Sequence, residues 1–282
     1  MARLTTTWLT LAAAGGASVT GVGAFDPARD GGLRAGSFAE TTMGSPFDDP
    51  SVEGRFAVSA GYELVITCWG EGAPTIVLEP GHPDSGHNQF GGTPFLEELA
   101  SMKRVCVYDR AGEGASDAPP IERRDADDVV RDLHDVLAAA DVEGPHLLVG
   151  ASFGGMIVTH YAETFPDDVV GVVLLDVPAP SADLDGPEFP ELQWDHPTNA
   201  ERLDIGAGFE GRFARQPTRF EAPLLVVTAL DGETDVADQS VWLDCSPDAE
   251  QIELAGGHDV FLSSPVEVVD AIITFVDRRV TQ

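Results

Sequence analysis

Short apolar runs alternate with longer amphipathic segments through most of this 282-residue chain. The amphipathic segments predict helices over 95–102, 127–141 and 153–163, and a last helix that begins at Ser264. The apolar runs predict strands near 54–58, 62–68, 75–79, 104–108, 146–149, 169–175, 224–227 and 251–254. Strands that alternate with helices form a mostly parallel sheet with helices on both faces. The pattern therefore predicts an α/β fold with eight strands.

The predicted last helix carries start signals of its own. Ser264 stands where a capping side chain would, Pro265 occupies the first helical position, and Glu267 follows the cap by three residues. Serine with glutamate at this spacing is typical of a capping box, in which each side chain accepts from the other residue's backbone N–H. We expect such a box here.

One segment, 177–222, interrupts the alternation of strands and helices. It holds several prolines and aromatic residues and is too long for an ordinary connection, so we expect a short lid inserted into the domain. Residues 25–52, ahead of the first predicted strand, lack periodicity and predict a linker or loosely attached arm. The domain itself is expected to span residues 53–282.

The first 24 residues predict a weak secretory signal peptide. Arg3 is the only charge, residues 8–14 are modestly apolar, and Val22-Gly23-Ala24 offers a small-x-small cleavage site. The alternative is an unstructured tail on a cytoplasmic protein. No other segment is long and apolar enough for a transmembrane helix, so stable membrane insertion is not expected.

A formal net charge of −32 changes the range of expected partners. Such a surface repels phosphate backbones and anionic lipids, so nucleic acid is not an expected partner. Lys103 is the only lysine. Acid excess with so little lysine suits a salt-rich environment or a GC-rich genome, but a surface that is simply acidic and soluble is the preferred interpretation.

Three cysteines leave at least one unpaired thiol in a monomer: Cys68, Cys106 and Cys245. Cys68 and Cys106 lie in two predicted strands. If these strands are neighbours, the two residues can form a disulfide, which would suit an exported protein. Two buried free thiols are the alternative. No C-x-x-C or H-x-x-x-H spacing occurs, so no metal site is expected.

The most informative motif is Gly-Ala-Ser-Phe-Gly over residues 150–154, between a predicted strand and a predicted helix. Glycines two positions before and after Ser152 let strand and helix approach closely, and the tight turn projects the hydroxyl outward. The N–H groups at the start of the next helix point toward whatever that hydroxyl attacks. Ser152 is therefore the candidate nucleophile.

Four motifs in order give the chain a resemblance to the α/β-hydrolase superfamily over roughly 54–278. They are residues 78–83 (Leu-Glu-Pro-Gly-His-Pro), 108–117 (Tyr-Asp-Arg-Ala-Gly-Glu-Gly-Ala-Ser-Asp), the Ser152 turn, and 256–258 (Gly-Gly-His). Among these proteins it looks most like small serine esterase-like hydrolases of actinobacterial type, which carry cysteines matching Cys68 and Cys106. Pro80 is a departure, since the family more often has a histidine there.

The resemblance implies a catalytic triad in which His258 is the base for Ser152, because a serine hydroxyl needs a base within hydrogen-bond reach. Two aspartates are candidates for the acid that orients the histidine. Asp231 is preferred because it precedes His258 by 27 residues, similar to the family's usual spacing. Asp176, at the end of the 169–175 strand, is the alternative. The backbone N–H groups of Phe153 and His82 are the implied oxyanion hole.

These residues predict a cofactor-free serine hydrolase that cleaves small carboxylic esters through an acyl-enzyme intermediate. The same triad also serves amide, lactone or carbon–carbon bond hydrolysis, because the pocket sets bond preference. Dehalogenases and epoxide hydrolases of this type use aspartate in place of Ser152, so they are disfavoured. A binding protein with slow turnover on the same fold is a further alternative. The side chains of His82, His87 and His196 are candidates for substrate contacts.

Overall fold

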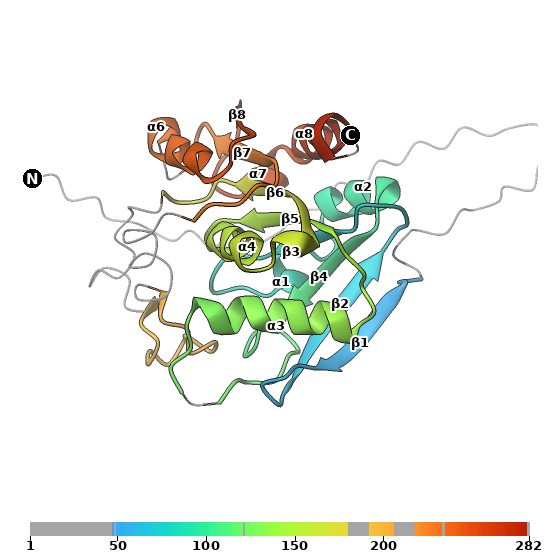
Figure 1. The fold of residues 1–282 in the computed structure, drawn as a ribbon, viewed down its shortest axis with the longest axis vertical. Helices are drawn as coiled ribbons and strands as arrows, with labels where there is room; N and C mark the ends of the chain where they lie inside the picture. Colours follow the sequence, from blue (N-terminus) through green and yellow to red (C-terminus); the bar gives the residue numbers. More distant parts are fainter. Residues whose placement is uncertain are drawn as a thin grey trace, which may run out of the picture. The chain divides into compact units, whose positions relative to one another are not determined.

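Eight strands form one sheet in the order β1-β2-β4-β3-β5-β6-β7-β8 in the computed structural model (Figure 1). Antiparallel pairing joins β1 to β2 and β2 to β4, and every other pair of neighbours is parallel. The strands are β1 (Val52–Ala57), β2 (Glu63–Trp69), β3 (Ile76–Glu79), β4 (Val105–Asp109), β5 (His146–Ala151), β6 (Val169–Leu175), β7 (Leu224–Ala229) and β8 (Ala249–Leu254). The predicted mostly parallel sheet is confirmed.

The structure describes residues 47, 49–120, 122–179, 192–205, 218–232 and 235–280. The predicted signal peptide, nearly all of the predicted arm, and residues 180–191 and 206–217 of the predicted lid lie outside these ranges. Within the described ranges, no helix combines the length and the apolar character that crossing a bilayer would require.

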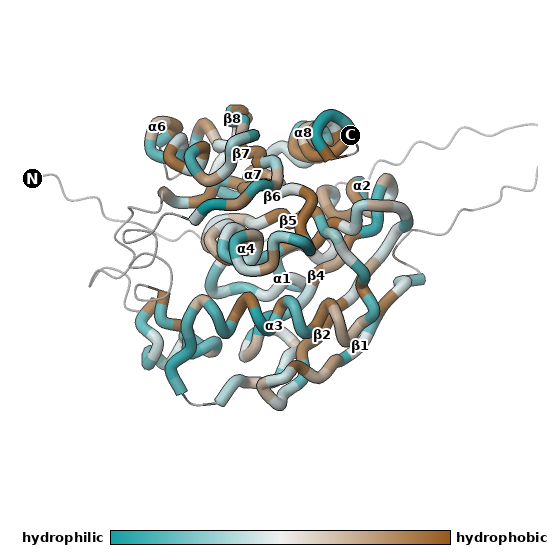
Figure 2. Tube along the Cα trace, in the orientation of Figure 1, coloured by the Kyte–Doolittle hydropathy of each residue, from teal (hydrophilic) through white to brown (hydrophobic). Residues whose placement is uncertain are grey.

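Helices cover both faces of the sheet. Helices α3 (Ala126–Ala139) and α4 (Phe153–Thr164) pack against one face, and α2 (Pro94–Met102), α7 (Val260–Ser263) and α8 (Pro265–Phe275) pack against the other. Figure 2 shows α3 alternating between apolar and polar colours along its length, as an amphipathic helix should. The short elements are α1 (Gly86–Phe90), α6 (Val236–Gln239), η1 (Pro166–Asp168), η4 (Ser240–Cys245) and η5 (Val276–Val280).

The last long helix starts where the sequence predicts, but the capping box does not form. Ser264 is the N-cap of α8, and its side chain makes no capping hydrogen bond to the helix. Its hydroxyl instead donates to the carbonyl of Ala255 at 2.6 Å. The prediction of a capping box at Ser264 and Glu267 is therefore wrong, because a tertiary acceptor takes the serine.

A disulfide joins Cys68 on β2 to Cys106 on β4. The two residues are paired in the antiparallel register, with their Cα atoms 4.0 Å apart. Of the two alternatives for these cysteines, the structure has the bridge, and Cys245 is left as a buried free thiol.

The parallel strands end at one edge of the sheet, and the predicted site residues follow those ends. His82 follows β3, Ser152 follows β5, Asp176 follows β6 and His258 follows β8. Ligands on open α/β sheets bind at the carboxyl ends of the strands. The topology therefore brings residues that are far apart in the sequence to one edge.

Candidate active site

Ser152 occupies a strained turn between β5 and α4. Its backbone has φ 50° and ψ −127°, a conformation that non-glycine residues rarely adopt. Such strain costs of order 1–3 kcal/mol and persists where the surrounding structure enforces it. The N–H of Ser152 donates to the carbonyl of Leu175 on β6 at 3.0 Å, and its carbonyl accepts from Gly155 at 2.9 Å. These bonds hold the partly exposed serine at the start of α4.

The two glycines of the motif are required by close approach. A Cβ added at Gly154 would lie 2.4 Å from the carbonyl oxygen of Glu79, and one added at Gly150 would lie 2.6 Å from the backbone of Gly154. Both distances are shorter than any side chain tolerates. The predicted reason for glycine at these positions, a tight approach of strand and helix, is confirmed.

His258 lies in the turn between β8 and α7 and contacts a buried carboxylate. Its Nδ1 atom is 2.7 Å from Oδ2 of Asp176, whose side chain is fully buried. The other oxygen, Oδ1, accepts from the backbone N–H of Ala229 at 3.1 Å and from Nε2 of Gln239 at 2.7 Å. Because Nδ1 faces a carboxylate, it carries the proton, and Nε2 of the neutral ring is left as the basic nitrogen.

The preferred pairing of His258 with Asp231 is not what the structure has. Asp231 is exposed in the turn after β7, and its backbone N–H donates to the carbonyl of Gly256 at 2.9 Å. Asp176 has a left-handed backbone, with φ 46°, and its N–H bonds to Val227 on β7. This directs its carboxylate under the histidine turn. Asp176 and Asp231 follow the neighbouring strands β6 and β7, so both lie at the same edge of the sheet. The 27-residue spacing from Asp231 to His258 therefore did not decide which of them pairs with the histidine.

The loop after β3 lies against the serine. A Cβ at Gly81 would be 3.3 Å from Cβ of Ser152. The N–H of Gly81 donates to Oε1 of Gln89, at 2.8 Å, so the next donor along the loop is His82. The rings of His82 and Phe153 meet edge to face with centroids 5.9 Å apart. The two residues predicted to supply backbone donors therefore flank the serine.

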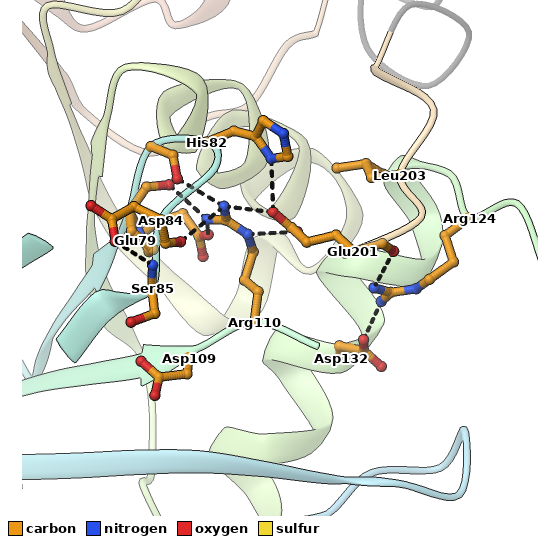
Figure 3. Close-up of polar contacts among 12 residues, drawn as sticks. Glu79, His82, Asp84, Ser85, Asp109, Arg110, Arg124, Asp132, Glu201 and Leu203 are labelled. Atoms are coloured by element: carbon orange, nitrogen blue, oxygen red, sulfur yellow. Dashed lines mark hydrogen bonds and ion pairs between the residues drawn. The ribbon is translucent and has the colours of Figure 1, made fainter. Parts of the chain in front are cut away.

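Beneath this loop lies a buried ionic cluster that the sequence analysis did not predict (Figure 3). Arg110 forms ion pairs with Glu79 at 2.8 Å and with Glu201 at 2.7 Å, and all three side chains are at most 2 % exposed. Glu201 comes from the described part of the segment predicted as a lid. Its Oε1 atom also contacts Nδ1 of His82, at 2.9 Å. Arg110 lies inside the 108–117 motif, and Glu79 and His82 lie inside the 78–83 motif, whereas Glu201 belongs to neither.

The two carboxylates of the cluster are affected differently by their surroundings. Burial raises the pKa of Glu79 to about 7, although the charge of Arg110 and the hydroxyl of Tyr108 partly oppose the shift. Burial would also raise the pKa of Glu201, but the nearby charge of Arg110 and the hydrogen bonds from His82 and Arg110 outweigh it. They hold that pKa well below its ordinary value. Glu201 is therefore the permanent anion of the pair.

The other two histidines predicted as substrate contacts make local polar contacts. His87 on α1 has Nδ1 2.8 Å from Asp109 and Nε2 2.8 Å from Oγ1 of Thr67. These contacts fasten α1 to β2 and β4. His196, within the predicted lid, has Nδ1 2.8 Å from Oγ1 of Thr198. In the part of the chain that the structure describes, no three His, Cys, Asp or Glu residues are placed to hold a metal ion.

Curated relatives match this chain over part of their length. The chain is 36 % identical over 107 residues to the uncharacterized protein YqjL of Bacillus subtilis, a match that covers 38 % of this chain and 41 % of the relative. The chain thus spans less than half the length of this relative.

Solved structures match it over most of its length. A thermophilic esterase from Thermogutta terrifontis has a TM-score of 0.63 at 19 % identity, covering 83 % of this chain and 100 % of that chain. Est816, described as an N-acyl homoserine lactone degrading enzyme, has a TM-score of 0.60 at 22 % identity, covering 79 % of this chain and 100 % of that one. At these identities the likeness shows the fold. The family model for the alpha/beta hydrolase fold matches residues 74–229, more than half of the chain. The chain therefore belongs to the alpha/beta hydrolase fold family.

Proposed function

We propose that this protein is a serine hydrolase that cleaves small carboxylic esters with Ser152 as nucleophile, His258 as base and Asp176 as the orienting acid. The observation that carries the proposal is the 2.7 Å contact between His258 and a buried Asp176, at the same edge of the sheet as the strained Ser152 turn. A base that is oriented by a carboxylate and comes within hydrogen-bond reach of a serine hydroxyl is the arrangement that activates serine.

In the proposed reaction, Ser152 Oγ attacks the ester carbonyl and passes its proton to Nε2 of His258. The carboxylate of Asp176 stabilises the resulting imidazolium. The tetrahedral intermediate places its oxyanion against the N–H groups of Phe153 and His82. His258 then gives the proton to the departing alcohol, and water repeats the sequence on the acyl-enzyme.

The first test is a fluorophosphonate label followed by mass spectrometry of the folded protein, together with turnover of p-nitrophenyl esters of increasing chain length. We expect the label on Ser152 and turnover of short to medium chains. Ser152→Ala should abolish both. A folded protein without label or turnover would favour the binding-protein alternative. Faster turnover of lactones or amides than of esters would change the proposed substrate class to those compounds and would leave the proposed triad unchanged.

The acid is assigned by a matched pair of variants, Asp176→Asn and Asp231→Asn. Asparagine at the acid position stabilises the wrong histidine tautomer, which costs about 10⁴-fold in kcat. We expect a loss of that order for Asp176→Asn and near-normal kcat for Asp231→Asn, measured with p-nitrophenyl acetate. The reverse result would restore Asp231 as the acid.

We further propose that the protein is exported. The disulfide between Cys68 and Cys106 supports this, because such bridges persist in oxidising compartments. N-terminal sequencing of protein recovered from the culture medium should show a mature chain that starts at or near Phe25. A full-length chain confined to the cytoplasm would contradict it.

A further inference from the structure

Arg110 sits at the centre of the buried cluster and uses every nitrogen of its guanidinium. Nε donates to Glu201 at 2.7 Å, and Nη1 donates to Glu79 at 2.8 Å and to the carbonyl of Pro80 at 2.7 Å. Nη2 donates to the carbonyl of Gly81 and to Glu201, both at 2.8 Å. A planar guanidinium with five fixed donors fits such a site, whereas a lysine ammonium does not.

Two of these acceptors belong to the backbone that leads to the proposed oxyanion donor. The carbonyl of Gly81 and the N–H of His82 are parts of one peptide unit, and this unit is trans. In a trans peptide the C=O and N–H bonds point in opposite directions. By holding the Gly81 carbonyl, Arg110 turns the His82 N–H away from the cluster. Within the described residues, no hydrogen-bond acceptor takes that N–H.

Glu201 closes the arrangement from the inserted segment. Its carboxylate holds Arg110 through both oxygens and contacts the imidazole of His82 through Oε1. Its own backbone carbonyl accepts from Arg124, at 3.3 Å, on a different part of the domain. Glu201 thus fixes both the arginine that orients the loop and the side chain of the residue whose N–H is oriented (Figure 3).

We propose that Arg110 and Glu201 are positioning residues for the oxyanion hole, and that docking of the inserted segment through Glu201 sets the orientation of the Gly81–His82 peptide. This inference rests on the proposed function. It predicts that the insertion contributes to the rate of the chemical step. Neither side chain needs to touch the substrate.

The test is Arg110→Lys in the full chain, assayed with p-nitrophenyl acetate. Lysine keeps the charge between the two glutamates but cannot reach both carbonyls. The Gly81 carbonyl then retains the longer bond from the N–H of Asp84, 3.3 Å, and its peptide is held less firmly. Removing a whole oxyanion donor costs about 10²–10³ in kcat, so a misoriented one should cost about 10- to 100-fold. KM should change little, because the donor is used mainly in the transition state. Inhibition by phenylboronic acid, which forms a tetrahedral adduct, should weaken in parallel with kcat.

The matched control is Arg279→Lys, the same conservative change at an ion-paired arginine outside the cluster. Arg279 lies in η5 and pairs with Asp248 and with Glu250 on β8. Among the described residues it makes no polar contact with the loop after β3 or with Glu201. We expect the kcat and the boronate inhibition of this variant to stay within about threefold of wild type.

Each outcome decides the question. A folded Arg110→Lys variant with wild-type kcat overturns the inference and leaves the proposed function intact. Equal losses in Arg110→Lys and Arg279→Lys also overturn it, since they would report general damage. If Arg110→Lys does not fold, Glu201→Gln is measured in its place, with the same criterion. If wild-type protein shows no turnover that depends on Ser152, the proposed function and this inference fall together.

Discussion

At the scale of single residues, the ionisation of Glu79 links the stability of the fold to pH between weakly acidic and neutral conditions. Its pKa is raised to about 7 by burial, from an ordinary value of 4.5. Between these values the folded protein holds a proton that the unfolded chain has lost. The free energy of unfolding therefore falls as pH rises from about 4.5 to 7, and stays reduced above that.

Glu79→Gln should remove this pH dependence, because the amide is neutral throughout. From pH 5 to pH 8, the free energy of unfolding of wild type should fall by on the order of 2 kcal/mol more than that of the variant. Urea unfolding at four pH values across that range measures it. Glu201→Gln is the control. Glu201 is ionised in both the folded and the unfolded chain above pH 5, so this substitution should change the free energy of unfolding by the same amount at every pH of the series. Wild-type and Glu79→Gln curves that run parallel would contradict the prediction.

The site residues differ in how far sequence determines them. Ser152 and the two glycines around it could be predicted from the sequence, because the conformation of the local turn requires them. Asp176 and Asp231 are not separable, because both follow buried strands and only the backbone at Asp176, with φ 46°, selects between them. Glu201 gives no signal at all. It lies in a segment without periodicity, and its role arises from a contact with Arg110, 91 residues away.

At the scale of elements, prediction succeeded where burial is complete. The strand predicted over 169–175 matches β6, Val169–Leu175, because a strand covered on both faces reads as an unbroken apolar run. Helix α1 was missed, since five residues are too few to show a helical stripe. The order β1-β2-β4-β3 was not predicted either, because strand pairing is decided by contacts distant in sequence.

The pairing of β2 with β4 carries the disulfide, which should stabilise this end of the sheet. Closing a loop of 38 residues restricts the unfolded chain and contributes roughly 3–4 kcal/mol. Replacing Cys68 and Cys106 together by alanine should lower the free energy of unfolding by about that amount, measured in urea. Added reductant should lower the free energy of unfolding of the wild type toward that of the double variant, and should leave the value of the double variant unchanged. Cys245→Ala, which keeps the bridge, should still respond to reductant. Equal stability of wild type with and without reductant would contradict this.

At the scale of the whole molecule, charge is the dominant feature. The chain carries 48 acidic side chains against 16 basic ones, one of which is lysine. Like charges at this density repel one another in the folded state, and the unfolded chain relieves part of that repulsion by expanding. The ion pairs described above neutralise only a few of the acids. Stability should therefore depend on how far the remaining charges are screened.

Raising NaCl from 0.1 to 1 M shortens the screening length from about 10 Å to about 3 Å, which removes most repulsion between exposed carboxylates. We expect the melting temperature at pH 7 to rise by several degrees, since about 1 kcal/mol corresponds to roughly 2–4 °C for a domain of this size. At pH 4, where many of the 48 acids are protonated, the same salt series should change the melting temperature far less. Equal salt responses at both pH values would mean that salt acts through general exclusion from the protein surface, and that net charge does not limit the stability of this fold.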